Sequence, residues 1–438
     1  MQLTQSAPTR SFRDLGIHPS LANALSAQGI ELPFPIQEAT IPDAIQGFDI
    51  LGRGQTGSGK TLAFGLALLT NIFGKRASAH KPVALVLAPT RELAQQINEV
   101  LHPLARSIGQ DSVVIAGGVP YGKQINALKR GVGILVATPG RLIDLIEREE
   151  VNLNSLLVTV LDEADQMADM GFLPAVKRIL NYSKKDSQRM LFSATLDRGV
   201  DGLVRQYLRD PKEHSIKEVE SSKGKMDHYV FVVDQGDKAS ITNQIASRDG
   251  KTIFFVRTQR GADKLTANLA KAGVFAEALH GGKSQSVRTK TLARFKEKSS
   301  AVLVATDVAA RGIHVDGIDL VVHYDAPADH KDYLHRSGRT ARAGELGRVV
   351  TLVTRSEQRS MNGITLRAGV EAWVMAITPM HQKLTSITGA KEPSGVPLVE
   401  RSPVTQEKAP KPFRVERSAR GKRPTNSRNR RRKFSNSR

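Results

Sequence analysis

The sequence predicts an α/β protein built from two tandem, doubly wound parallel sheets. Short apolar runs alternate with stretches of helical pattern, which is typical of parallel strands buried on both faces. A polar, charged stretch between residues 210 and 226 interrupts this alternation, which then resumes. The apolar runs are residues 49–51, 83–87, 113–115, 134–136, 157–161 and 190–192 in the first series, and 228–233, 252–256, 302–305, 320–323 and 348–352 in the second.

The two series divide the chain into four expected parts. These are a first domain over residues 1–210, a linker over 211–226, a second domain over 227–389 and a basic tail over 390–438. The end of the second domain has helical patterns and the only tryptophan, Trp373, for which we prefer a packing role. The tail is expected to be disordered, because residues 401–438 carry fourteen Lys and Arg against two Glu and little apolar content.

Composition narrows the class of partner. The formal net charge of +21 favours a polyanion, and without a basic amphipathic anchor we expect nucleic acid and no membrane. The chain has no cysteine, which excludes disulfides and thiolate metal sites and fits a reducing compartment. Residues 1–10 lack the apolar core of a signal peptide, and no stretch approaches the roughly 20 apolar residues of a membrane span. We therefore predict a soluble, cytoplasmic protein.

A glycine-rich loop between an apolar strand and a helical pattern predicts a nucleotide site. Its sequence is Gly54-Gln55-Thr56-Gly57-Ser58-Gly59-Lys60-Thr61. Backbone N–H groups of such a loop hold phosphate oxygens at the helix N-terminus. We expect Lys60 to reach the outer phosphates and the Thr61 hydroxyl to bind Mg²⁺.

A pair of carboxylates follows the apolar run of residues 157–161. The segment is Asp162-Glu163-Ala164-Asp165, and the carboxyl end of a strand beside a phosphate loop is where Mg²⁺ needs a ligand. We expect Asp162 to bind Mg²⁺ and Glu163 to orient or deprotonate an attacking water. Paired carboxylates are usually solvated, but this position favours the catalytic interpretation.

Three further features fit a nucleotide site less specifically. The Gln37 amide matches the hydrogen-bonding edge of adenine, although polar residues at helix N-termini are common. Phe12 either stacks beside the base or belongs to the core. Arg339 and Arg342 lie three residues apart, on one helical face if the segment is helical, and could act as arginine fingers. Alone, these arginines would more often form a solvated basic face.

Taken in order, these segments resemble the motifs of DEAD-box RNA helicases of superfamily two, of a bacterial type with a basic C-terminal tail. The resemblance runs from Phe12 to about Gly344, and its specificity lies in the complete ordered set. The matching segments are Phe12 with residues 29–37, residues 54–61, Pro89-Thr90-Arg91-Glu92-Leu93, Gly117-Gly118, Thr138-Pro139-Gly140-Arg141, Asp162 to Asp165, Ser193-Ala194-Thr195, residues 253–258, His280-Gly281-Gly282 with Gln285, residues 305–312 and residues 335–342.

The resemblance implies two RecA-like domains and an ATP-dependent RNA helicase that unwinds short duplexes or remodels RNA–protein complexes, with ATP and Mg²⁺ as cofactors. The residues it implies for ATP binding are Phe12, Gln37, Gly54, Gln55, Thr56, Gly57, Ser58, Gly59, Lys60, Thr61 and Asp307. Those implied for catalysis are Lys60, Asp162, Glu163, Arg339 and Arg342, with Thr61 and Asp162 at Mg²⁺. Those implied for RNA binding are Pro89, Thr90, Arg91, Gly118, Thr138, Arg141, Arg257 and Thr306. Those implied to couple hydrolysis to unwinding are Asp165, Ser193, Thr195 and His335.

The residue types in the implied RNA motifs suit a reader of the nucleic-acid backbone. Hydroxyls, bare N–H groups and cations match phosphates and 2′-hydroxyls and carry little base information. Aromatic residues make up only 5% of the chain, so no platform for stacking bases is evident. We expect low sequence specificity, added non-specific affinity from the tail, and ribosomal or RNA-degradation assemblies as contexts, with no oligomer required.

Four positions depart from the family pattern, and two alternatives stay open. His314 replaces a usual acidic residue, Phe34 replaces a small hydroxyl residue, and Ser337 and Ala341 replace commoner choices. One alternative is a helicase or translocase that acts on DNA. The other is an RNA chaperone whose basic tail carries the activity.

Overall fold

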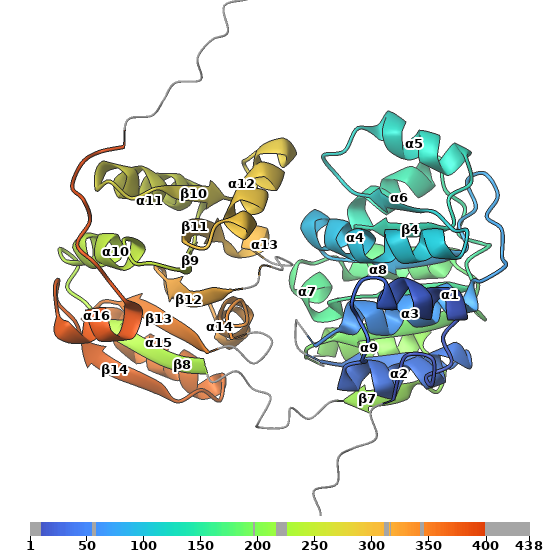
Figure 1. Cartoon of the computed structure of the whole chain (residues 1–438), viewed down its shortest axis with the longest axis horizontal. Coiled ribbons are helices and arrows are strands. Elements are labelled where there is room, and N and C mark those ends of the chain that lie inside the picture. The colour runs from blue at the N-terminus through green and yellow to red at the C-terminus, as the bar shows by residue number, and fades with distance from the viewer. Residues whose placement is uncertain are drawn as a thin grey trace, which may run out of the picture. The chain divides into compact units, whose positions relative to one another are not determined.

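The computed structural model describes residues 10–54, 58–195, 198–215, 226–310, 315, 317–341 and 346–398 of the 438-residue chain. In this part of the chain two sheets of seven parallel strands form, which confirms the predicted fold class (Figure 1). Some predicted features lie outside the described residues: Gln55, Thr56, Gly57, Arg342, His314 and the tail beyond Leu398.

The first domain contains one sheet with the strand order β3-β4-β2-β5-β6-β1-β7. Its strands are β1 (Ile50–Arg53), β2 (Ala84–Leu87), β3 (Ser112–Ile115), β4 (Ile134–Ala137), β5 (Val158–Leu161), β6 (Gln188–Ser193) and β7 (Lys212–Ser215). Its helices are α1 (Pro19–Ser26), α2 (Pro35–Ile45), α3 (Lys60–Asn71), α4 (Arg91–Ser107), α5 (Tyr121–Lys129), α6 (Pro139–Glu147), α7 (Ala164–Asp169), α8 (Leu173–Tyr182) and α9 (Arg198–Tyr207).

The second domain repeats this order as β10-β11-β9-β12-β13-β8-β14, so each strand has a counterpart in the first sheet. Its strands are β8 (Met226–Val232), β9 (Lys251–Val256), β10 (Ala276–Leu279), β11 (Ala301–Thr306), β12 (Ile318–His323), β13 (Gly347–Val353) and β14 (Ala372–Ala376). Its helices are α10 (Lys238–Ala246), α11 (Gln259–Lys271), α12 (Gln285–Glu297), α13 (Asp307–Ala310), α14 (His330–Ser337), α15 (Arg355–Arg367) and α16 (Gln382–Thr388).

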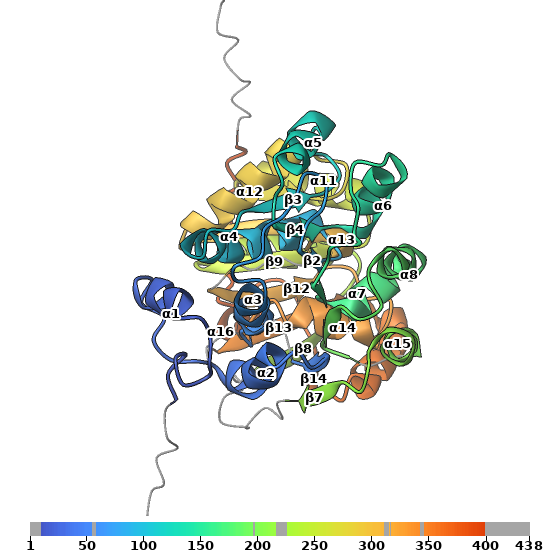
Figure 2. The same ribbon diagram turned by 90° about the vertical axis from the view of Figure 1, so that its right-hand side faces the viewer.

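Each sheet separates two apolar clusters, because successive strand side chains point to opposite faces. In β2, Ala84 and Val86 belong to one cluster and Leu85 and Leu87 to the other. Figure 2 shows the resulting layers of the first domain, with α4 on one side of the sheet and α6 and α8 on the other. The central strands β2, β4 and β5 are thus buried on both faces, as their continuous apolar runs predict.

Two edge strands differ from expectation. Lys212–Ser215 was expected within the linker but forms β7 beside β1, and its sequence has no apolar residue to mark a strand. Trp373 was expected in a helical, packed region but lies in β14, paired with β8, and is 67% exposed. Both strands lie at a sheet edge and pair through their backbone. Side-chain patterns could not reveal β7, whereas β14 is a short apolar run that could have marked a strand.

The boundary of the second domain also lies later than expected. Residues 390–398, which we call the C-terminal strap, pack on the second domain instead of belonging to the tail. The Lys391 N–H donates to the Gln244 carbonyl at 3.0 Å, and the Leu398 N–H donates to the Ala270 carbonyl at 2.9 Å. Ala390 is buried in the apolar core. The strap forms no helix or strand, and its sequence, with two prolines and a glycine, resembles that of a linker. This is why the sequence alone assigns it to the tail.

In the described part of the chain, no helix combines the length and the apolar content that crossing a membrane requires.

We predict that packing of α3 on α4 depends on glycine at position 65. A Cβ at Gly65 would lie 2.3 Å from Leu101 Cδ2, and Leu101 is fully buried. Gly65→Val should therefore lower the free energy of unfolding by about 1–3 kcal/mol, the usual cost of overpacking. Denaturant titration checks this, with Gly202→Val as the control, because Gly202 is helical and has no atom within 4 Å of a Cβ. Equal losses in both variants would contradict the prediction.

Candidate functional site

The loop lysine lies at the start of α3, at the carboxyl end of β1. Lys60 is buried, and its Nζ donates to the Gly54 carbonyl at 2.6 Å. Gly59 caps the helix with φ +88°, a left-handed conformation that favours glycine. A Cβ at Gly59 would also lie 2.6 Å from Gln37 Nε2, so this position has no room for a side chain.

Gln37 connects the segment before α2 to this loop. It is 1% exposed, its Nε2 donates to the Gly59 carbonyl at 3.0 Å, and its Oε1 accepts from the Phe34 N–H at 2.8 Å. The structure therefore brings Gln37 to the loop, as a role in nucleotide binding requires. Phe12 is 3% exposed and belongs to the apolar core. Of its two expected roles, core packing and stacking on the base, the structure shows core packing.

Three buried acidic residues follow β5 at the centre of the first sheet. Asp162, Glu163 and Asp165 are 3%, 5% and 2% exposed. The Glu163 N–H donates to Asp162 Oδ1 at 3.0 Å, and Glu163 adopts φ +51° where it caps α7. A non-glycine residue in this conformation is strained, which is common at functional sites.

Burial changes the acidity of the carboxylate pair. Loss of hydration raises the pKa of Asp162, although the nearby Lys60 ammonium opposes the change. Burial and the neighbouring Asp162 raise the pKa of Glu163 to about 7. Glu163 Oε2 is buried with no hydrogen-bond partner among the described residues. A carboxylate with this pKa can accept a proton near neutral pH.

Asp165 holds the segment that follows β6. Its Oδ2 accepts hydrogen bonds from the Ala194 N–H at 3.1 Å, the Thr195 N–H at 2.9 Å and the Thr195 hydroxyl at 3.0 Å. The Ser193 hydroxyl donates to the Thr195 carbonyl at 2.6 Å. The structure therefore brings together the three first-domain residues implied in coupling.

Two arginines of the implied RNA motifs meet at one turn of the first domain. Arg91 Nη1 donates to the Gly117 carbonyl at 2.8 Å, and Arg141 Nη1 donates to the Val119 carbonyl at 3.0 Å. Gly118, between these carbonyls, has φ +76°, and a Cβ there would lie 1.7 Å from Arg91 Nη1. Thr90 and Thr138 cap α4 and α6, one and three residues before these arginines. Pro89 precedes Thr90, so all five implied residues of α4 and α6 lie at helix N-termini.

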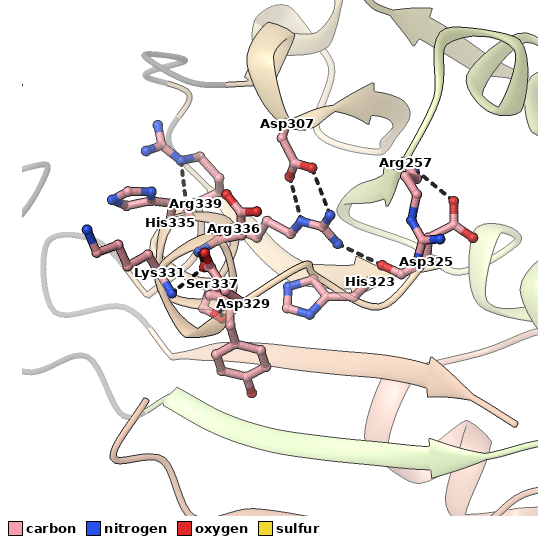
Figure 3. A network of polar contacts seen from close by, with 12 residues as sticks. Arg257, Asp307, His323, Asp325, Asp329, Lys331, His335, Arg336, Ser337 and Arg339 are labelled. Carbon is pink, nitrogen blue, oxygen red and sulfur yellow. Dashed lines mark hydrogen bonds and ion pairs between the residues drawn. The ribbon is translucent and has the colours of Figure 1, made fainter. Parts of the chain in front are cut away.

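In the second domain an ion pair joins α13 to α14 (Figure 3). Arg336 is 3% exposed, and its guanidinium donates to Asp307 Oδ1 at 2.5 Å and Oδ2 at 2.8 Å. Arg336 Nη1 also donates to the Asp325 carbonyl at 2.7 Å, while Asp325 Oδ2 accepts from the Arg257 N–H at 2.8 Å. Asp325 and Arg336 thus connect two implied sites, Arg257 and Asp307.

Sequence reasoning missed Arg336 and Asp325. The only available signal was that Arg336 stands among the three arginines of residues 335–342. Thr306, which the resemblance implies in RNA binding, lies at the end of β11, next to Asp307.

Arg339 lies beyond the end of α14, which finishes at Ser337 with Gly338 as its cap. The helix stops before Arg339, so the condition under which Arg339 and Arg342 would share a helical face is not met. Arg339 is 2% exposed, and its Nε donates to the His335 carbonyl at 3.2 Å (Figure 3).

A loop lysine beside buried carboxylates, at the carboxyl edge of a doubly wound sheet, defines a phosphate-loop nucleotide-binding protein. Family models agree and are more specific: "DEAD/DEAH box helicase" matches residues 34–203, and "Helicase conserved C-terminal domain" matches residues 237–344. The chain belongs to the DEAD-box helicase family.

Named relatives and solved structures support this assignment. "DEAD-box ATP-dependent RNA helicase 9, mitochondrial" of Arabidopsis thaliana is 41% identical over 369 residues, which cover 82% of this chain and 60% of the relative. "DEAD-box ATP-dependent RNA helicase 30" of the same plant is 42% identical and is likewise covered over 60% of its length. The structure of S. cerevisiae Dbp5 bound to RNA and ADP BeF3 matches with a TM-score of 0.75 and 30% identity, over 84% of this chain and 95% of that chain. The two domains are therefore RecA-like, and the chain spans 60% of the length of these curated relatives.

We predict that Glu163 destabilises the folded protein above neutral pH. Its pKa rises from 4.5 to about 7 on folding, so the folded state binds the proton more tightly and loses stability as the pH rises between these values. Glu163→Gln should stabilise the protein at pH 8 by up to about 3 kcal/mol, and the gain should fade toward pH 4.5. Denaturant unfolding across this range checks it. Glu213→Gln is the control, because Glu213 is exposed, and the same pH dependence in both variants would refute the prediction.

Proposed function

We propose that this chain is an ATP-dependent RNA helicase that separates short RNA duplexes or remodels RNA–protein complexes without sequence preference. The observation that carries the proposal is the buried pair Asp162 and Glu163 beside Lys60. A carboxyl group with a pKa of about 7, near the loop lysine, suits removal of a proton from a water that attacks a γ-phosphate.

Residues of the first domain would bind ATP and Mg²⁺ and activate the attacking water. The main chain of the loop and Lys60 would bind the phosphates, and Gln37 would bind adenine with Phe12 behind it. Thr61 and Asp162 offer the oxygen ligands that Mg²⁺ prefers, and when bound the ion would supply positive charge to the phosphate oxygens. Glu163 would orient the attacking water and take its proton at the unpartnered Oε2.

The second domain would complete the nucleotide site. Arg339 and Arg342 would stabilise charge on the departing phosphate, and Asp307 would contact the ribose. Since Asp307 is paired with Arg336, ribose binding would share or replace that ion pair. We propose that ATP and RNA together close the two domains, because each is bound by groups from both.

RNA would be held by its backbone. The proposed contacts are Pro89, Thr90, Arg91, Gly118, Thr138, Arg141, Arg257 and Thr306. Asp165, Ser193, Thr195 and His335 would couple this contact to hydrolysis, and the hydrogen bonds of Asp165 to residues 194 and 195 support a shared role. We place this activity in the cytoplasm, on ribosomal or RNA-degradation assemblies, in keeping with a basic chain free of cysteine.

The central experiment measures ATP hydrolysis with and without a structured RNA. We expect slow basal turnover and strong stimulation by RNA, and Glu163→Gln should lower the stimulated rate by about 10²–10⁴-fold through loss of the base. Lys60→Ala should abolish both hydrolysis and duplex separation. Stimulation by DNA equal to that by RNA would instead support a DNA enzyme. Duplex separation that survives in Lys60→Ala would support an RNA chaperone.

A second experiment tests the basic tail. Truncation should follow Leu398, because an earlier cut removes the C-terminal strap that packs on the second domain. We expect the truncated protein to bind RNA more weakly at low salt and to lose part of the salt dependence of binding, about 0.7 units of log–log slope per lost contact with single-stranded phosphate. The ATPase rate at saturating RNA should not change. The control keeps the tail's length but replaces its Lys and Arg by Gln, and parental affinity in that variant would exclude tail charge as the cause.

A further inference from the structure

An aromatic ring at the start of α5 contacts two arginines of the first domain. The Arg141 Cζ lies 4.0 Å from the centroid of the Tyr121 ring, and the Arg148 Cζ lies 4.8 Å from it. The Tyr121 hydroxyl donates to Asp144 Oδ2 at 2.5 Å. Tyr121 is 37% exposed, so the ring is part of the surface. Nothing in the motif pattern of the sequence assigns it a role.

The two arginines differ in how firmly they are held. Arg141 contacts the ring, donates to the Val119 carbonyl at 3.0 Å and lies 3.8 Å from Asp144, and its side chain is 12% exposed. Arg148 pairs with Asp144 at 2.9 Å, but its side chain is 58% exposed. The environment therefore restrains the guanidinium plane of Arg141 much more than that of Arg148.

Arg141 and Arg91 donate to carbonyl groups of the same turn. The turn of residues 117–119 accepts from Arg91 at Gly117 and from Arg141 at Val119. Gln124 of α5 also donates to the Val119 carbonyl, at 2.9 Å. Tyr121 thus lies two residues beyond a turn that aligns two cations, on the helix that fixes this turn.

We propose that Tyr121 is a positioning residue that holds Arg141 ready for an RNA phosphate. The inference rests on the proposed role of Arg141 in RNA binding. A guanidinium stacked on a ring keeps its remaining N–H groups in one plane, which suits phosphate oxygens and lowers the entropy lost on binding. The Tyr121 ring contacts the face of the Arg141 guanidinium, and the Val119 carbonyl accepts a hydrogen bond from its edge.

The test measures binding of a labelled single-stranded RNA, with a non-hydrolysable ATP analogue, and RNA-stimulated ATPase. Tyr121→Leu should raise the RNA dissociation constant and the KM for RNA about two- to five-fold, the loss expected for an exposed cation–π contact. It should leave kcat and the KM for ATP unchanged. Tyr121→Phe keeps the ring and should restore binding close to that of the parent, which a general loss of folding would not allow.

A double-mutant cycle separates positioning from direct contact. Arg141→Ala should weaken RNA binding, and adding Tyr121→Leu to it should change nothing further. A full additional loss would mean that the ring stacks on RNA itself and would overturn the proposal. Arg148→Ala is the matched control and should bind RNA like the parent, so a loss equal to that of Tyr121→Leu would assign the effect to the wrong arginine.

The RNA contact of Arg141 and the positioning role of Tyr121 can be excluded separately. If Arg141→Ala binds RNA with parental affinity, the proposed contact of Arg141 is wrong, and the role of Tyr121 falls with it. If Arg141→Ala weakens binding but Tyr121→Leu does not, the RNA contact stands and only the positioning role is excluded.

Discussion

The burial of two adjacent carboxyl groups is the constraint on which the first domain depends. Asp162 and Glu163 are almost fully buried and neighbour each other, so each ionised form lacks hydration and repels the other. The fold tolerates this because β5 lies in the middle of a sheet covered on both faces and because Lys60 supplies opposite charge nearby. Glu163 also keeps a strained backbone with φ +51°. Unfavourable burial and backbone strain of this kind are found where a catalytic site requires the residue.

The repeated topology places different chemistry at equivalent points. In the second sheet β8 occupies the place that β1 has in the first, so the segment after β8 corresponds to the phosphate loop. That segment is Asp234-Gln235-Gly236-Asp237, whose two carboxylates would repel phosphate. Duplication of the fold therefore leaves one phosphate loop, and the second domain is available to contribute charged groups such as Arg339.

Much of this arrangement was predictable from sequence, for identifiable reasons. Central strands are continuous apolar runs, and residues such as Lys60 and Asp162 follow strands whose carboxyl ends must share one edge. The edge strand β7 was missed, because Lys212–Ser215 pairs through its backbone and carries no apolar side chain. The Arg336–Asp307 pair was missed because it joins residues 29 positions apart, and no local pattern encodes such a partner.

The acceptor of each arginine determines how much of its positive charge remains available to a phosphate. Arg336 donates to both oxygens of Asp307, so its charge is neutralised inside the domain and it cannot also serve a phosphate at full strength. Arg91 donates to a main-chain carbonyl, which orients the guanidinium without cancelling its charge. A cation aligned by a neutral acceptor keeps its attraction for a polyanion, so the turn of residues 117–119 can orient Arg91 without weakening its attraction for phosphate.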